Sequence, residues 1–353
     1  MIDPNSPTTL SPTPSAPTTS APTTLADVAR LAGVSKMTAS NVINNKPGMT
    51  EATRARVRRA IEQTGYVANP AARVLAGRRT NLIGVIAPRY GVPYVTDLIQ
   101  GAIAAAEGAG MSLAVFTTSG NVTVERERAA LLRALADGVL LILPSGDEHL
   151  IFQNTVPVVT AGAFSPYSVR GDNVHGGRLV ARHLLALGHR RVAYVRGPGA
   201  PGIQHEESAA RERGFLQVLG EGGVEVPAAY LQGGDFTEGG GEQAAGVLLT
   251  LPEPPRAIFA ANDPTAFGVL RAAEKLGVRV PGDLSVVGYD DVGAAARSRP
   301  PLTTVRQPLP EMGEAAVRML LDLVRGNSPP PPPLFPTSLI VRHSTGPPRT
   351  PLG

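Results

Sequence analysis

The chain has 353 residues, a formal net charge of +4 and 42% hydrophobic residues, so it is long enough to hold two or three domains with substantial cores. It contains no cysteine, which excludes disulfide bonds and thiolate metal sites. No apolar run reaches the length of a membrane span, and the first residues lack the charged and apolar regions of a signal peptide. We therefore expect a cytoplasmic protein that has no membrane partner.

Residues 1–23 are dominated by proline, serine and threonine. Such a composition supplies too few apolar side chains to build a packed core. We therefore expect residues 1–23 to form a disordered, mostly extended tail, and we assign no function to it.

Residues 24–44 have the spacing of two short helices joined by a tight turn. From Leu25 onward, apolar residues recur at the i, i+3, i+4 and i+7 positions of one helical face, and Gly33 can adopt the positive φ that a sharp turn requires. Ser35 can cap the second helix with its hydroxyl. The inward face of that helix is predicted to consist of Val34, Ala39, Val42 and Ile43. The outward face is predicted to consist of Lys36, Met37, Thr38, Ser40 and Asn41. An ordinary helical hairpin shares this spacing, but the pattern also predicts a helix-turn-helix whose second helix enters the major groove of DNA.

Two more helices are expected before residue 80. Thr50 can cap a third helix, in which Val57, Ala60 and Ile61 close a small core, so residues 24–68 form a headpiece. Residues 69–79 have a cap residue, a proline at the first helical position and a glycine just past the end, which predicts a short hinge helix. A helix of about two turns is marginal in water on its own. DNA and a second copy of the chain are the expected partners that stabilise it.

Positive charge is concentrated in the headpiece and hinge. Between Thr24 and Arg79 there are ten Lys or Arg residues and three acidic residues, so this segment carries about +7 and the rest of the chain is slightly acidic. A solvated basic face is one explanation. Local positive charge is also what a module that binds DNA phosphates requires.

From residue 80 to residue 345, predicted strands alternate with predicted helices. The first half has strands at 82–87, 112–116, 138–143 and 156–159 and helices at 95–110 and 125–135. After residue 173 the pattern restarts, with strands at 191–195, 230–231, 257–260 and 284–289, helices at 177–187, 211–219, 239–249 and 265–276, and a last strand at 337–341. Apolar strands between helices indicate parallel sheets covered on both faces. The predicted fold class is α/β: an all-α helix-turn-helix headpiece plus two doubly wound parallel-sheet subdomains, arranged as a periplasmic-binding-protein-like clamshell.

Motifs for catalysis are weak or missing. Residues 197–202 have the glycine spacing of a dinucleotide loop, but two prolines are incompatible with the turn that such a loop needs. The sequence has no Gly-x-Ser-x-Gly elbow, and its six histidines lack metal-ligand spacing. We therefore expect no enzyme activity, no catalytic residue, no metal and no cofactor.

The chain resembles the lac-repressor/purine-repressor (LacI/GalR) family of bacterial transcriptional regulators. The resemblance rests on residues 25–44, 66–70 and 75–77, and further along on 211–215, 261–263, 288–291 and 300–307. It implies a homodimer that binds double-stranded operator DNA, with Leu75 wedged into a minor-groove step. The DNA-binding residues that it implies are Thr24, Leu25, Ser35, Lys36, Met37, Thr38, Ser40, Asn41, Asn44, Thr50, Thr53, Tyr66, Asn69, Ala72 and Leu75. The chain departs from the family at Ala39-Ser40-Asn41, where members usually carry an arginine, and asparagine favours adenine over guanine.

The same resemblance implies a small-molecule effector, a sugar or related metabolite, bound in the cleft between the two subdomains. The implied effector-binding residues are Arg211, Phe236, Asn262, Asp290 and Gln307. Together such side chains offer the donors and acceptors that a polyol needs. Gly162 stands where many family members have an aspartate at a strand end, so one acceptor is missing there.

These features predict a repressor whose affinity for its operator is controlled by the effector. One alternative is a periplasmic-type sugar-binding protein without a DNA role, and another is an α/β enzyme that processes a sugar or nucleotide.

Overall fold

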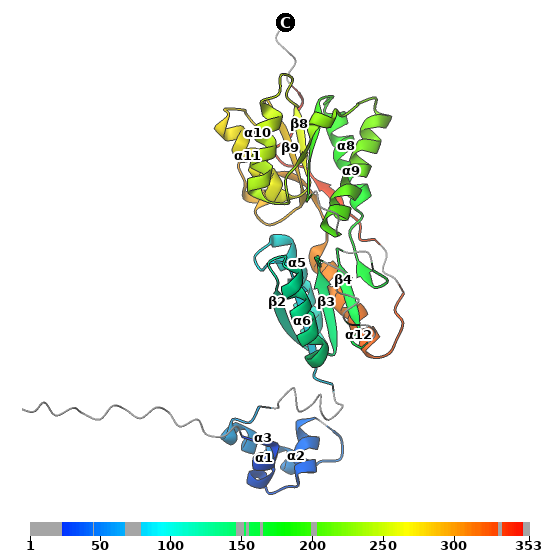
Figure 1. Ribbon diagram of the computed structural model, residues 1–353. Helices are drawn as coiled ribbons and strands as arrows, with labels where there is room; N and C mark the ends of the chain where they lie inside the picture. Colours follow the sequence, from blue (N-terminus) through cyan, green and yellow to red (C-terminus); the bar gives the residue numbers. More distant parts are fainter. Residues whose placement is uncertain are drawn as a thin grey trace, which may run out of the picture. The chain divides into compact units, whose positions relative to one another are not determined.

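The computed structural model describes residues 23–44, 46–67, 79–145, 152, 155–162, 165–198, 203–330 and 334–348. The chain divides into two compact units, Met1–Gly77 and Arg78–Gly353 (Figure 1). Residues 1–22 of the predicted tail and residues 69–78 of the predicted hinge helix lie outside the described residues, and with them Asn69, Ala72 and Leu75.

The first unit contains the three predicted helices of the headpiece: α1 (Leu25–Ala32), α2 (Lys36–Ile43) and α3 (Glu51–Thr64). Threonine or serine hydroxyls cap all three N-termini, and Gly33 and Gly65 end α1 and α3 in the left-handed conformation. The helices enclose a small core of Val28, Ala29, Ala32, Ala39, Val42, Val57 and Ala60. Local capping and apolar spacing therefore account for this unit.

Two positions in α2 differ from the prediction. Ser40 was expected on the outward face, but it is buried and only 9% exposed. The Asn44 amide Nδ2 donates to the Ser40 backbone oxygen at 2.5 Å and lies 3.4 Å from the Ser40 hydroxyl oxygen. Ile43, expected on the inward face, is only half-buried.

The first lobe of the second unit is a parallel sheet covered on both faces. Its strands are β1 (Leu82–Ala87), β2 (Ser112–Thr117), β3 (Gly138–Ile142), β4 (Val158–Ala161) and β5 (Ser168–Val169), in the order β2-β1-β3-β4-β5. Helices α5 (Pro93–Gly108) and α12 (Leu309–Val324) pack on one face, and α6 (Val122–Leu135) packs on the other. Strands β1, β3 and β4 are almost fully buried, as their continuous apolar runs predicted, and they share the core with the inward faces of α5, α12 and α6.

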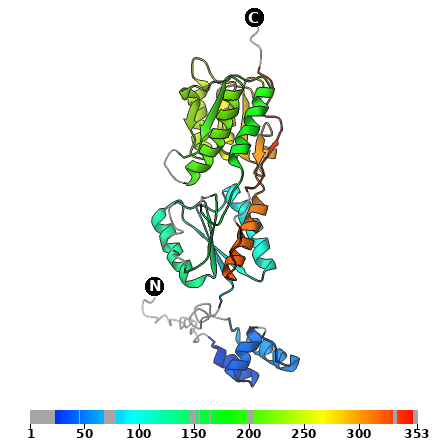
Figure 2. The same ribbon diagram turned by 90° about the vertical axis from the view of Figure 1, so that its right-hand side faces the viewer.

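The second lobe repeats this plan (Figure 2). Its strands are β6 (Val192–Arg196), β7 (Leu231–Gly233), β8 (Ala257–Ala260), β9 (Ser285–Asp290), β10 (Thr303–Arg306) and β11 (Ser338–Ile340), in the order β11-β10-β9-β8-β6-β7. Helices α8 (Asn173–Ala186) and α9 (Ile203–Glu221) cover one face, and α10 (Glu238–Leu249) and α11 (Asp263–Lys275) cover the other. Two short 3-10 helices are η1 (Ala228–Tyr230) and η2 (Ala295–Arg297). The α/β fold class with two doubly wound lobes is confirmed.

The lobes are not successive halves of the chain, which corrects the expectation that the pattern simply restarts after residue 173. After β10 the chain returns to the first lobe, where Met312, Ala316 and Leu320 of α12 join its core. It then contributes β11 to the second sheet, antiparallel to β10. Strands β5 and β10 and helix α12 were not predicted. Short strands carry little periodic signal. Helix α12 does have helical spacing in its buried residues Leu309, Met312, Ala316 and Leu320, so this apolar pattern is the signal that could have predicted it.

Close packing of α5 against α12 depends on glycine. A methyl group added at Gly101 would lie 1.8 Å from the Pro310 backbone oxygen, and one added at Gly313 would lie 1.9 Å from the Leu98 backbone oxygen. Neither neighbour is a flexible side chain, so a substitution would push the two helices apart.

We therefore expect Gly101→Ala to lower the free energy of unfolding of the core by about 1 to 3 kcal/mol, the usual cost of overpacking. Urea denaturation monitored by circular dichroism measures the change. Gly108→Ala is the matched control, because it lies on the same helix with no atom within 4 Å of the added methyl group. Equal stability of the two variants would contradict the prediction.

Candidate DNA interface and effector site

The outward face of α2 presents side chains suited to DNA. Lys36 is exposed and Met37 is 68% exposed, while Thr38 and Asn41 are partly exposed. The Ser35 hydroxyl accepts from the backbone N–H of Thr38 at 3.0 Å and so fixes the first turn of the helix. Recognition helices contact base edges with such N-terminal residues.

Several predicted DNA-binding residues also have a structural role in the headpiece. Thr24 and Asp27 form a reciprocal capping box at the start of α1, and the Thr50 and Thr53 hydroxyls lie 2.9 Å apart at the start of α3. Leu25 and Tyr66 pack against the headpiece core. The capped N-termini remain favourable places for a phosphate, because helix dipoles and backbone N–H groups attract anions there.

Much of the positive charge of the headpiece has no acidic partner. Within the described residues 23–44 and 46–67, the ion pairs join Arg30 to Asp27 and Arg58 to Glu51. The cations that form no ion pair within these ranges are Lys36, Lys46, Arg54, Arg56 and Arg59. Cations left without a carboxylate are available to neutralise phosphates.

In the second lobe, the five predicted effector-binding residues lie together near the carboxyl ends of the strands. Asp290 ends β9, and its carboxylate accepts a hydrogen bond from Gln307 Nε2 at 2.8 Å. Arg211 NH2 lies 3.8 Å from Asp290 Oδ1, and the Arg211 guanidinium lies 5.8 Å from the centre of the Phe236 ring. Asn262 caps α11 and donates from Nδ2 to the Phe236 backbone oxygen at 3.1 Å. A single network of contacts thus connects residues that are far apart in the chain.

Arg211 is the centre of this network and is only 4% exposed. Its Nε donates to Asn173 Oδ1 at 2.8 Å, and its NH1 donates to the Ala261 backbone oxygen. The guanidinium also stacks 3.8 Å from the centre of the Tyr289 ring, which compensates part of the cost of burying the charge. These contacts leave the Arg211 side chain with a defined orientation toward Asp290.

Asp290 is buried in an unusual conformation. Its φ of 106° is rare for any residue except glycine, and such strained positions cluster at functional sites. Burial raises the pKa of its carboxyl from 3.8 to about 6, although Arg211 and the hydrogen bond from Gln307 oppose the rise. The carboxyl therefore stays ionised at neutral pH and accepts hydrogen bonds.

Three further residues belong to this cluster and were not among the predicted effector-binding residues. Asn173 begins α8 and hydrogen-bonds Arg211, while the Glu207 carboxyl accepts from the Asn173 amide. Tyr94 of α5 comes from the first lobe, and burial together with the charges of Glu207 and Asp290 raises the pKa of its hydroxyl. Asn173 lies before the predicted helix at 177–187, and neither Asn173 nor Glu207 nor Tyr94 lies in a motif that the resemblance carried, so no signal in the sequence pointed to them.

Gly162 lies directly after β4, in the place where the resemblance implies a missing aspartate. Its φ is 73°, and a methyl group there would lie 2.5 Å from a Leu143 methyl carbon and 3.4 Å from the Tyr94 hydroxyl oxygen. The backbone conformation and these neighbours favour glycine. The Tyr94 hydroxyl thus lies within contact distance of the Cβ atom that any residue other than glycine would have at position 162.

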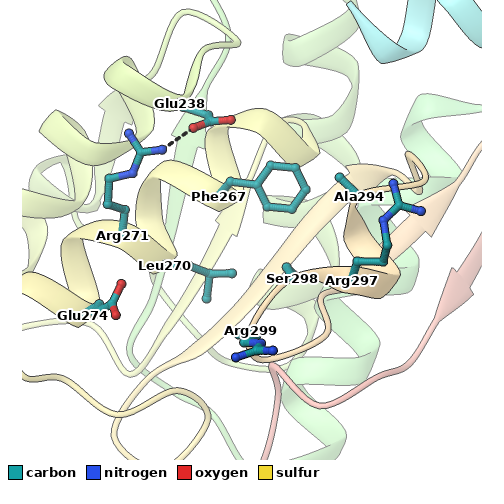
Figure 3. Close-up of a pocket in the computed structure, with 9 residues that line it drawn as sticks. All are labelled: Glu238, Phe267, Leu270, Arg271, Glu274, Ala294, Arg297, Ser298 and Arg299. Carbon is teal, nitrogen blue, oxygen red and sulfur yellow. Dashed lines mark hydrogen bonds and ion pairs between the residues drawn. The ribbon is translucent and has the colours of Figure 1, made fainter.

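A separate surface pocket of about 400 Å³ lies on the second lobe, between α11 and the segment around η2 (Figure 3). Its lining residues are Glu238, Phe267, Leu270, Arg271, Glu274, Ala294, Arg297, Ser298 and Arg299. Arg271 is paired with Glu238 at 2.5 Å across this surface. None of the five predicted effector-binding residues lines it, so it is distinct from the Arg211 cluster. No group of three or more histidine, aspartate or glutamate side chains in the described ranges is arranged to hold a metal ion.

Two parts of the chain match known families. Residues 24–69 match the bacterial regulatory proteins of the lacI family, and residues 181–345 match the periplasmic binding protein-like domain. The ribose operon repressor of Escherichia coli (strain K12) is 33% identical over 310 residues, which cover 85% of this chain and 92% of that repressor.

Solved structures agree with these matches. The lac repressor dimer bound to operator and the anti-inducer ONPF has a TM-score of 0.81 and 30% sequence identity, covering 92% of this chain and all of that one. The complex of the transcriptional regulator CelR with cellobiose has a TM-score of 0.68 and 32% identity, covering 91% of this chain and 99% of that one.

A helix-turn-helix headpiece and a two-lobed core of the periplasmic-binding-protein type define a class of transcriptional regulators. This chain belongs to the lacI family of bacterial regulatory proteins. The match over the headpiece favours a DNA-binding regulator over a periplasmic-type binding protein without a DNA role. Within the described ranges, no helix is both long enough and apolar enough to cross a membrane.

Proposed function

We propose that this protein is a cytoplasmic, homodimeric transcriptional repressor that is not an enzyme. Residues 24–68 would be the DNA-binding headpiece, 69–79 the hinge helix and 80–345 the effector-binding and dimerisation core. The observation that carries the proposal is the buried Arg211–Asp290–Gln307 network. The same chain has a basic headpiece in which five cations of the described residues 23–44 and 46–67 form no ion pair there.

The headpiece supplies the two kinds of contact that specific DNA binding needs. Exposed cations such as Lys36 neutralise phosphates, and Asn41 on the same helix reads a base edge in the major groove. Leu75 of the hinge would widen a minor-groove step and bend the operator. The lac repressor dimer bound to operator supports two headpieces on a two-fold symmetric site.

The core supplies a site for a sugar or related metabolite. The buried Asp290 carboxylate accepts hydrogen bonds, the buried Arg211 guanidinium donates them, and the Asn262 and Gln307 amides can do both. Hydrogen bonds from Asn262 to the Phe236 backbone oxygen and from Gln307 to Asp290 fix the positions of these side chains before a ligand binds. The CelR complex with cellobiose and the name of the ribose operon repressor support a sugar as ligand. An effector that binds one arrangement of the lobes more tightly would shift the hinge helices and change operator affinity.

The test uses two variants, each of which should impair one binding site and leave the other unchanged. Asn41→Ala should weaken operator binding by about 1 to 3 kcal/mol and relax the preference at one base pair of each half-site, with effector affinity unchanged. Asp290→Asn should weaken effector binding about five- to a hundredfold, with operator affinity unchanged in the absence of effector. An operator is first selected from random DNA, and each variant is then titrated with this operator in the presence and absence of sugars. These titrations measure operator affinity and its response to the effector.

The converse pattern would contradict the proposal. If Asp290→Asn abolishes operator binding in the absence of effector but retains normal ligand affinity, Asp290 supports the fold and not the ligand. If a folded wild-type protein selects no DNA sequence, the regulator function itself is wrong.

A further inference from the structure

The buried residues beside Arg211 include a continuous layer of aromatic rings in the second lobe. Tyr194 of β6, Phe259 of β8, Tyr289 of β9 and Phe215 of α9 are all fully buried. The Phe259 ring lies 5.0 Å from the Tyr194 ring and 5.1 Å from the Phe215 ring, centre to centre. It lies 6.4 Å from the Tyr289 ring. Aromatic pairs at such separations attract one another, so the core of the lobe fixes the Tyr289 ring in place.

Tyr289 connects this aromatic layer to Arg211. The central carbon of the Arg211 guanidinium lies 3.8 Å from the centre of the Tyr289 ring, so the cation lies over the face of the ring. Arg211 and Phe215 are one turn apart on α9, and Phe215 packs into the same layer. One set of contacts therefore holds both the ring that supports the guanidinium and the helix that carries it.

The stacked ring leaves the edge of the guanidinium free to form hydrogen bonds. The N–H groups of arginine point outward in the plane of the guanidinium. Nε donates to Asn173 Oδ1 and NH1 donates to the Ala261 backbone oxygen. NH2 lies 3.8 Å from Asp290 Oδ1 and forms no hydrogen bond with a described residue. NH2 is therefore the donor that a ligand can use, and the directions of its N–H bonds depend on the plane that the ring defines.

The Tyr289 hydroxyl contributes little to this arrangement. It is buried and has no hydrogen-bond partner among the described residues. A methyl group added at Gly176 would lie 2.3 Å from the hydroxyl oxygen, so α8 packs closely against this end of the side chain. The part of Tyr289 that acts on Arg211 is therefore the ring.

We propose that Tyr289 is a positioning residue of the effector site. The face of its ring holds the Arg211 guanidinium in the plane in which NH2 donates to an oxygen atom of the effector. The inference rests on the proposed function of the core as a sugar site, and it adds a residue that acts on the ligand through Arg211. Attraction between a cation and an aromatic face is stronger when both are removed from water, and both side chains are buried here.

The experiment changes the ring face and keeps the shape of the side chain, in the full-length protein. Tyr289→Phe removes only the hydroxyl. A pentafluorophenyl ring at the same position has nearly the same shape, but its fluorine atoms withdraw electrons, so its face no longer attracts a cation. D-ribose, D-glucose and cellobiose are titrated by calorimetry, and the sugar that binds the wild type most tightly is the probe.

Tyr289→Phe should bind this sugar with nearly the affinity of the wild type, because the ring face remains. The pentafluorophenyl ring should weaken binding about five- to thirtyfold relative to Tyr289→Phe, the range expected for a desolvated contact between a cation and a ring. An unchanged affinity in the fluorinated protein would overturn the inference.

Phe259 provides the matched control, because its ring belongs to the same buried layer and packs against other rings. A pentafluorophenyl ring in its place changes this layer but leaves the ring that lies against Arg211 as it is. The sugar affinity should then stay at the wild-type value. If the fluorinated rings at positions 259 and 289 weaken the sugar equally, the effect is one of core packing and the inference is wrong.

The melting temperature of the ligand-free protein tests the same contact without a sugar. The fluorinated ring at position 289 should lower it by about 2 to 4 °C relative to Tyr289→Phe, and this difference should disappear when both proteins also carry Arg211→Met. An equal difference with and without Arg211 contradicts the inference.

The titrations also separate this inference from the proposed function. If a sugar binds and changes operator affinity while the fluorinated ring at position 289 alters neither value, the repressor function stands and the inference is wrong. If none of the three sugars binds the wild type, the sugar-effector function is contradicted together with the inference.

Discussion

Raising the salt concentration from 50 to 200 mM is expected to lower the affinity of this protein for its operator by about 10³- to 10⁵-fold. This is the response of a protein that makes about six to ten phosphate contacts, because each contact releases a counterion from the DNA. The headpiece has the charge for such contacts: Lys36, Arg56 and Arg59 are exposed and form no ion pair within the described headpiece. A dimer carries two headpieces and therefore twice as many of these exposed cations.

Fluorescence anisotropy with a labelled operator at several salt concentrations measures this slope. Lys36→Gln should reduce the slope by about one for each phosphate contact that is lost, and it should weaken binding to all sequences nearly equally. Asn41→Ala should instead change the sequence preference at an unchanged slope, because it contacts a base. A flat salt response, or one monomer for each operator, would contradict the headpiece assignment.

The headpiece could be predicted closely from sequence because its structure is local. The caps Thr24, Ser35 and Thr50 and the turn residue Gly33 all act within one helical turn of their own positions. Ser40 is the exception. A polar residue on a short helix was expected to face outward, but Ser40 is buried, and the side-chain amide of Asn44 at the C-terminal cap of α2 donates to its backbone oxygen.

The effector site could be predicted only in part. Arg211, Asn262, Asp290 and Gln307 lie in motifs that the resemblance carried, and the structure places them in one network. Their assignment as ligand contacts remains a proposal. Glu207 and Tyr94 lie in no such motif, and their proximity depends on two lobes connected by several crossings of the chain. Long-range contacts of this kind leave no periodic signal in the sequence.

Replacing Arg211 with methionine is expected to lower the free energy of unfolding of the core by about 3 to 5 kcal/mol at pH 7.5. Removing one partner of a buried ion pair leaves the other charge uncompensated, and this costs more than the pair itself contributed. Here the substitution leaves the buried Asp290 carboxylate without its ion-pair partner. It also removes the Arg211 donors of the hydrogen bonds to Asn173 Oδ1 and to the Ala261 backbone oxygen. Urea denaturation of the ligand-free protein measures the change.

The pH dependence of this loss follows from the acids that remain. In the wild type, the pKa of Asp290 is raised from 3.8 to about 6, so the folded state binds more protons than the unfolded state in this range, and stability falls as the pH rises from about 4 to 6. Without Arg211, an attraction that holds this pKa down is lost, and the pKa rises further. The cost of Arg211→Met should therefore be largest above pH 7 and should shrink toward pH 5, where the carboxyl binds a proton and the buried charge disappears.

Two variants make the Arg211 result specific. Arg213→Met removes an exposed arginine from the same helix and should change stability by less than about 0.5 kcal/mol at either pH. Arg211→Met combined with Asp290→Asn should recover part of the stability lost in the single variant, because no unpaired charge remains at position 290. If Arg211→Met were as stable as Arg213→Met, or if its cost were the same at pH 5 and pH 7.5, Arg211 would not be the counter-charge that allows Asp290 to be buried in ionised form.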